Sequence, residues 1–117
     1  MSLQFSFIIP VYNRPDEIQE LLESFKNLEG NTPFEIVIVE DGSSNDSKAV
    51  VDSFLYDLNI SYFFKENSGP GDSRNYGMRH AKGNYFIILD SDCILPKQYL
   101  SEVVKSLKTD YVDCFGG

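Results

Sequence analysis

Two aspartates, Asp90 and Asp92, interrupt the apolar stretch FIILDSDCILP at residues 86–96. On an extended chain their side chains point to the same side, about 6–7 Å apart, and two carboxylates this close repel by roughly 1–3 kcal/mol. A divalent cation between them would remove that repulsion, and Mg²⁺ and Mn²⁺ prefer such oxygen ligands. A turn or helix-capping pair is the alternative, but the position directly after an apolar strand favours a metal site.

Three further residues could contact a ligand. Asp41, in the turn sequence DGSSNDS, could accept a hydrogen bond from an N–H of a nucleotide base or could cap the turn. Tyr12 could stack on a base or form an exposed rim, and Arg74 could contact a phosphate or remain an exposed cation. If Asp41 contacts only a ligand and does not stabilise the fold, Asp41→Ala should weaken nucleotide binding by about 1–3 kcal/mol. The melting temperature should then stay nearly unchanged.

The elements that would position these residues alternate between strand and helix. Apolar runs predict strands, and apolar residues at helical spacing predict the helices between them. The second helix is expected to bury Phe54 and Leu55. This alternation predicts a single α/β domain over residues 1–117, with a Rossmann-like three-layer α/β/α architecture and a mainly parallel twisted sheet. The expected strands are 5–11, 34–40, 60–64 (nearer an edge), 84–89 and 111–115, and the last two helices are 73–82 and 97–108.

The polar clusters fall where these strands end. Tyr12 and Asn13 follow the first expected strand, Asp41 follows the second, and Asp90 and Asp92 follow the fourth. In an open parallel sheet, ligands bind in the crevice beyond the carboxyl ends of the strands. The sequence therefore predicts one ligand site at that edge.

The charge of the chain limits its possible binding partners, and its cysteines indicate the redox environment. The net charge of −8 at pH 7 makes a nucleic-acid partner held through its phosphates improbable on physical grounds, since no basic stripe is available. The two cysteines, Cys93 and Cys114, lack zinc-ligand spacing and are expected to be reduced thiols of a cytoplasmic protein. No signal peptide or membrane-spanning stretch is apparent.

Three motifs together resemble one known family. They read FSFIIPVYNRPDEIQELLESF, EIVIVEDGSSNDS and NSGPGDSRNYGMRHAKGNYFIILDSDCILP. In this order and spacing, from about Phe5 to Leu107, the chain resembles the N-terminal, nucleotide-sugar-binding half of a family 2 glycosyltransferase of the GT-A fold. No single motif is decisive, but the combination of the three is specific.

The resemblance implies a role for each matched residue. Tyr12 would pack on the base, Asp41 would hydrogen-bond it, and Asp90 and Asp92 would bracket the diphosphate as ribose and metal carboxylates. Arg74 opens the third helix of the family pattern. The implied metal ligands are Asp92 and Asp90, the cofactor is Mn²⁺ or Mg²⁺, and the implied nucleotide-sugar-binding residues are Pro10, Tyr12, Asn13, Glu40, Asp41, Arg74, Asp90 and Ser91.

The chain also departs from the family pattern. Glu40 stands where aspartate is commoner, and Ser91 and Cys93 flank Asp92 where a further aspartate is frequent, so metal affinity is expected to be weaker. The family's acceptor pocket and general base are expected beyond Gly117, and no catalytic base is assigned within the chain.

The resemblance further implies the reaction of a longer parent protein. That reaction would be inverting transfer of a sugar, from a UDP-sugar first of all, to a glycan or lipid-linked saccharide in cell-surface polysaccharide synthesis. The parent could lie peripherally at the membrane. By itself the chain is expected to transfer no sugar and to self-associate through apolar surface left uncovered.

Three alternatives remain open at this point. The chain could be a nucleotide-binding module without catalysis. It could be a phosphorelay receiver, although the first strand does not end in the acidic pair that a receiver needs. A nucleotidyltransferase would need a Gly-rich basic loop after that strand, where the sequence reads PVYNRP.

Overall fold

Four parallel strands form the sheet. The computed structural model describes residues 4–29, 33–83 and 85–109, and the strands within them run in the order β3-β2-β1-β4. Ile8 on β1 lies between Val37 on β2 and Ile88 on β4, so β1 is central. The predicted parallel sheet is confirmed, and its strands are β1 (Phe5–Val11), β2 (Phe34–Asp41), β3 (Ile60–Lys65) and β4 (Tyr85–Ile88).

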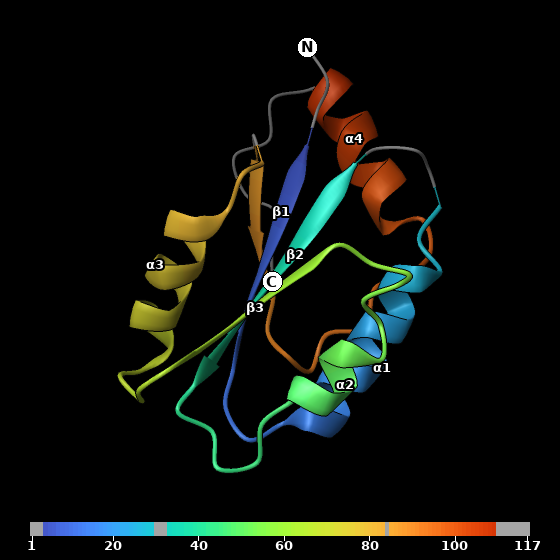
Figure 1. The fold of residues 1–117 in the computed structure, drawn as a ribbon. Helices are drawn as coiled ribbons and strands as arrows, with labels where there is room; N and C mark the ends of the chain where they lie inside the picture. The colour runs from blue at the N-terminus through green and yellow to red at the C-terminus, as the bar shows by residue number, and fades with distance from the viewer. Residues whose placement is uncertain (1–3, 30–32, 84, 110–117) are drawn as a thin grey trace.

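Helices cover both faces of this sheet (Figure 1). Three lie on one face and α3 lies alone on the other. This is the three-layer α/β/α arrangement expected of alternating strands and helices joined by right-handed crossovers. The helices are α1 (Pro15–Lys26), α2 (Lys48–Asp52), α3 (Pro70–His80) and α4 (Tyr99–Thr109).

The core lies in two layers because successive strand residues point to opposite faces. Phe7 and Ile9 pack in the larger layer with the apolar faces of α1 and α4, whereas Ile8 and Val39 pack in the smaller layer under α3. Gly77 allows this close packing, since a Cβ atom there would lie 2.6 Å from Cγ2 of Ile8. Burial on both faces explains why the central strands are almost continuously apolar.

Two predicted elements differ from the structure. α2 ends at Asp52 and turns follow, so Leu55 is 49% exposed and its predicted burial is wrong. α3 begins at Pro70, three residues before the predicted start, because a first-turn proline needs no hydrogen bond to its missing N–H. The predicted strand 111–115 lies outside the described residues.

The edges of the described sheet carry exposed aromatic side chains. β3 is an edge strand, as predicted, and Phe64 on it is exposed. On the opposite edge, Tyr85 and Phe86 of β4 are also exposed. Among the described residues, no helix combines the length and the hydrophobicity needed to cross a bilayer.

Candidate functional site

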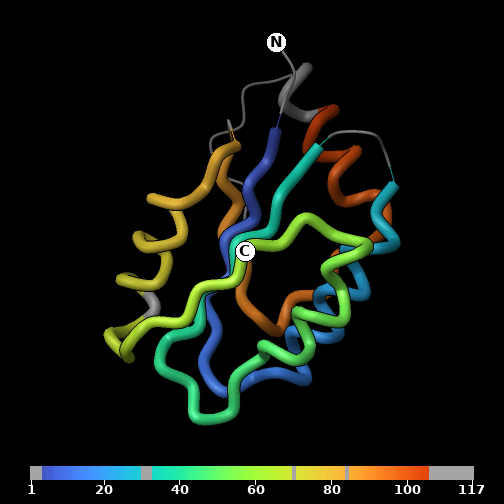
Figure 2. Tube along the Cα trace, viewed as in Figure 1, coloured from blue at the N-terminus to red at the C-terminus, as the bar shows by residue number. Residues whose placement is uncertain are grey.

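A pocket of about 360 Å³ lies at the carboxyl ends of the strands. Figure 2 shows the turns after β1 and β2 at the bottom of the view and the turn after β3 at the lower left, all at the carboxyl ends of the strands. Six of the predicted nucleotide-sugar-binding residues reach this pocket, although they come from four separate segments of the chain. The pocket is lined by Pro10, Val11, Tyr12, Asp41, Asn67, Gly69, Arg74, Asp90 and Ser91.

Asp41 is the most constrained side chain of the pocket. Its Oδ1 accepts hydrogen bonds from Nζ of Lys65 at 2.7 Å and from the backbone N–H of Ser68 at 2.8 Å. Its Oδ2 accepts one from the N–H of Gly69 at 2.9 Å. Burial alone would raise the pKa of Asp41, but these hydrogen bonds and the charge of Lys65 outweigh burial and hold the pKa below its ordinary value. Asp41 therefore remains ionised at neutral pH and anchors the loop after β3.

Glu40, which the resemblance implied as a nucleotide-binding residue, does not line the pocket. Its side chain is fully buried. One oxygen accepts a hydrogen bond from Oγ of Ser43 at 2.5 Å, and the other accepts bonds from the N–H and Oγ of Ser47. A buried carboxylate must be satisfied in this way, and these bonds hold the loop between β2 and α2.

Asn13 also supports the loops instead of lining the pocket. Its φ of 53° lies in the left-handed region, which asparagine tolerates better than most residues. Its N–H donates to Oγ of Ser43 at 2.8 Å, and its Oδ1 accepts from the N–H of Asn45 at 2.9 Å. These bonds join the first two loops of the site, and Asn13, implied by the resemblance as a nucleotide-binding residue, does not line the pocket.

Asp90 and Ser91 line the pocket, whereas Asp92 does not. The hydroxyl of Ser91 donates to Oε1 of Glu17 at 2.8 Å, which ties this turn to α1. The carboxylates of Asp90 and Asp92 are exposed, and among the described residues neither makes a hydrogen bond or an ion pair. Burial raises the pKa of Cys93 and the charges of the two aspartates raise it further, which indicates negative potential at the turn.

This donor set fits a hard divalent cation that keeps most of its water. Mg²⁺ commonly binds through one or two carboxylates together with substrate phosphates. Within the described part of the chain, no group of three or more His, Cys, Asp and Glu side chains is arranged to hold a metal by itself. Asp90 and Asp92 could therefore hold Mn²⁺ or Mg²⁺ only with further ligands from water or from a bound diphosphate.

Tyr12 and Arg74 provide the aromatic and cationic groups of the pocket. Tyr12 is 53% exposed, an exposure that suits a stacking platform. Arg74 is half-buried on α3 and is the single cationic side chain in the pocket lining. Among the described residues it makes no ion pair, so its charge is available to an anionic ligand.

Sequence reasoning missed Asn67 and Lys65. Nδ2 of Asn67 donates to the backbone oxygen of Asp41 at 2.9 Å, which places the loop after β3 against the end of β2. Gly42 permits this contact, since a Cβ there would lie 2.6 Å from the backbone nitrogen of Asn67. The glycine- and proline-rich sequence after the third strand was the available signal, because such loops allow close backbone approach to a ligand.

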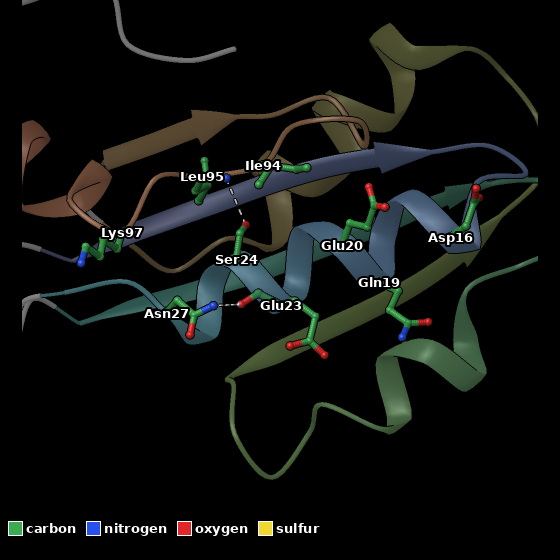
Figure 3. Close-up of a pocket in the computed structure, with 9 residues that line it drawn as sticks. All are labelled: Asp16, Gln19, Glu20, Glu23, Ser24, Asn27, Ile94, Leu95 and Lys97. Atoms are coloured by element: carbon green, nitrogen blue, oxygen red, sulfur yellow. Dashed lines mark hydrogen bonds between the residues drawn. The ribbon is translucent and has the colours of Figure 1, made fainter.

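A larger groove of about 980 Å³ lies between α1 and the segment after β4 (Figure 3). Its lining carries three carboxylates, from Asp16, Glu20 and Glu23, and one cation, Lys97. A diphosphate would be repelled by this charge. The smaller pocket at the strand ends, with Arg74 in its lining, is therefore the better candidate for an anionic ligand.

Comparison with known proteins identifies the family of the chain. The family described as "Glycosyl transferase family 2" matches residues 6–117. The chain is 38% identical over 103 residues to an uncharacterized glycosyltransferase of Rickettsia felis, covering 88% of this chain and 17% of that protein. It is 31% identical over 114 residues to the poly(ribitol-phosphate) beta-N-acetylglucosaminyltransferase TarS of Staphylococcus aureus, covering 95% of this chain and 20% of TarS.

Solved structures show the same fold. TarS residues 1–349 in complex with UDP-GlcNAc match with a TM-score of 0.84 and 32% identity, over 91% of this chain and 31% of that one. The mannosyltransferase PcManGT of Pyrobaculum calidifontis, in complex with GDP-Man and Mn²⁺, matches with a TM-score of 0.80 and 26% identity, over 92% of this chain and 33% of that one. The predicted fold class is thus confirmed, and the chain spans a third or less of these proteins.

Proposed function

Because the chain belongs to glycosyl transferase family 2, we propose that its pocket binds a nucleotide-diphosphate sugar, a UDP-sugar first of all, as the donor of a glycosyl transfer. The single observation that carries this proposal is the gathering of Tyr12, Asp41, Arg74 and Asp90 around one pocket at the carboxyl edge of the sheet. Family membership also excludes the phosphorelay receiver and the nucleotidyltransferase as alternatives.

Each group has a chemical role in this proposal. Tyr12 stacks on the base, and Asp41 accepts a hydrogen bond from a ring N–H of the base. Asp90 contacts the ribose, and Arg74 compensates part of the charge of the diphosphate. The remaining pocket wall consists of backbone from Pro10 and Gly69, together with Ser91 and Asn67.

We propose that Asp90 and Asp92 hold Mn²⁺ or Mg²⁺ together with the diphosphate. When bound, the cation supplies Lewis-acid stabilisation of the leaving nucleotide. In the proposed inverting transfer, an acceptor hydroxyl attacks the anomeric carbon of the sugar and gives its proton to a base. That the chain alone transfers no sugar remains a prediction.

The proposal extends to the parent protein. A glycan or a lipid-linked saccharide is the proposed acceptor, in cell-surface polysaccharide synthesis at the cytoplasmic side of a membrane. Self-association of the chain through its uncovered apolar surface also remains a prediction. These statements rest on family membership, since the pocket at the strand ends is proposed for the donor and not for the acceptor.

Calorimetric titration with UDP tests the proposal. Wild-type chain should bind UDP, and Tyr12→Ala should bind it about tenfold more weakly, because stacking of a base on an aromatic ring contributes about 1–3 kcal/mol. Tyr56→Ala is the matched control, since Tyr56 is fully exposed and does not line the pocket. Absence of UDP binding, or equal affinity of the two variants, would refute the proposed site.

A further inference from the structure

We propose that Lys65 is a positioning residue for base recognition: it fixes the carboxylate of Asp41 so that a single acceptor position on Oδ2 faces the nucleotide. This inference rests on the proposed function, because it concerns how the same pocket recognises its ligand. Lys65 itself does not line the pocket, so it acts through Asp41 and through the loop at residues 66–69.

The ammonium group of Lys65 uses all three of its hydrogens, one on Asp41 and two on this loop. Nζ donates to Oδ1 of Asp41 at 2.7 Å, to the backbone oxygen of Glu66 at 2.9 Å and to Oγ of Ser68. The side chains of Lys65 and Asp41 are only 13% and 7% exposed. The parallel register of β2 and β3 sets Asp41 and Lys65 side by side, so the two strands hold the pair in place before any ligand arrives.

Counting acceptor positions shows what remains for a ligand. Each carboxylate oxygen accepts two hydrogen bonds. The Oδ1 atom of Asp41 is filled by Lys65 and by the N–H of Ser68, whereas Oδ2 accepts only from the N–H of Gly69. One acceptor position therefore stays open on Oδ2. It suits a base with a ring N–H, such as uracil, and offers nothing to a base edge that carries only acceptors.

Lys65 also corrects the charge of the pocket. The charged groups around Asp41 are Lys65 from β3 and, in the pocket lining, Arg74 and Asp90; the remaining titratable group there is Tyr12. Without Lys65, two carboxylates would face one guanidinium, and an incoming diphosphate would meet net negative charge. With Lys65, the negative charge of the ionised Asp41 is compensated by the ammonium group. The carboxylate can then recognise a base without repelling the phosphates.

The test compares substitutions at Lys65 with one at Lys48, whose exposed pair with Asp52 provides a matched loss of charge. Affinity for UDP is measured by calorimetry, and folding by thermal melting. At neutral pH, Lys65→Met should weaken UDP binding by about tenfold, the loss expected for a hydrogen-bonded charge, and Lys65→Arg should restore most of it. Lys48→Met should bind like wild type.

A pH profile separates positioning from simple support of the loop. Without the lysine, the pKa of Asp41 rises, so UDP affinity in Lys65→Met should be lost on acidification at a higher pH than in wild type. If Lys65→Met does not fold, Lys65→Gln takes its place, because glutamine keeps an N–H donor without the charge. In that case the inference is supported if, on acidification, Lys65→Gln loses its affinity for UDP at a higher pH than Lys65→Arg does.

The outcomes distinguish this inference from the proposed function. Wild-type chain that binds no UDP would overturn both. A second outcome would overturn only the positioning role of Lys65. In it, the wild-type chain binds UDP, and the folded Lys65 variants match Lys48→Met in UDP affinity and in pH profile.

Discussion

Replacement of Asp41 by alanine should lower the free energy of unfolding by about 2–4 kcal/mol. The substitution removes the acceptor of three donors: the N–H groups of Ser68 and Gly69 and the ammonium of Lys65. A hydrogen bond to a charged group contributes about 1.5–3 kcal/mol. The expected total is smaller than three such bonds, because the released lysine keeps its contacts with Glu66 and Ser68 and the loop can reach water.

Thermal unfolding followed by calorimetry measures this loss. For a chain of 117 residues, a loss of this size should lower the melting temperature by about 8–16 °C. Hydrogen exchange should show faster exchange at the amides of Ser68 and Gly69. Asp52→Ala is the control, since Asp52 forms an exposed ion pair with Lys48 and such pairs contribute about 0–1 kcal/mol.

A melting temperature of Asp41→Ala within about 2 °C of that of Asp52→Ala, less than 1 kcal/mol for this chain length, would refute this reasoning. It would show that the three hydrogen bonds to the carboxylate of Asp41 do not stabilise the fold. It would also restore the expectation drawn from the sequence, in which Asp41 acts on the ligand alone and its loss leaves stability unchanged.

The remaining predictions concern the metal, acid sensitivity and helix packing. UDP binding should strengthen when Mn²⁺ is added, and Asp92→Asn should abolish this increase; equal affinity with and without Mn²⁺ in titrations of the wild type would contradict the metal role. The lowered pKa of Asp41 means that its ionised form stabilises the fold above about pH 4, the ordinary range of an aspartate, and that this contribution is lost as the pH falls through the lower folded-state pKa. The stability of Asp41→Asn should therefore not show this loss as the pH is lowered. If acid denaturation of Asp41→Asn follows the same pH dependence as that of the wild type, the prediction is contradicted. Gly77→Ala should destabilise the fold by about 1–3 kcal/mol, because its Cβ would overlap Ile8. Gly71→Ala, with open space around its Cβ, should leave the midpoint of urea unfolding unchanged. Equal midpoints for the two variants would refute this packing argument.

Much of the fold follows from local pattern. Apolar runs predicted β1 and β2 as strands, and helical spacing predicted α1 and α4. The boundaries of α2 and α3 were less accurate. Leu55 continues the apolar spacing of α2, but turns begin after Asp52, and a pattern of residue types does not show where a helix stops if no strong breaker is present.

The location of the site was predicted, but only part of its lining. Tyr12, Asp41 and Asp90 each follow a strand, and the carboxyl ends of parallel strands must share one edge. The sequence does not show which of two neighbouring carboxylates lines the pocket. Glu40 and Asp41 are adjacent, yet two serines enclose the first, and the second lines the pocket.

The sequence by itself thus determined the alternation of strands and helices, the parallel class of the sheet and the edge at which polar residues gather, because these depend on residue periodicity along the chain. Only the tertiary structure decided that Lys65 stands beside Asp41 and that Asn67 closes the wall of the pocket. Those contacts depend on the register between β2 and β3 and on the path of the loop that follows. Both are fixed by packing between segments far apart in the chain.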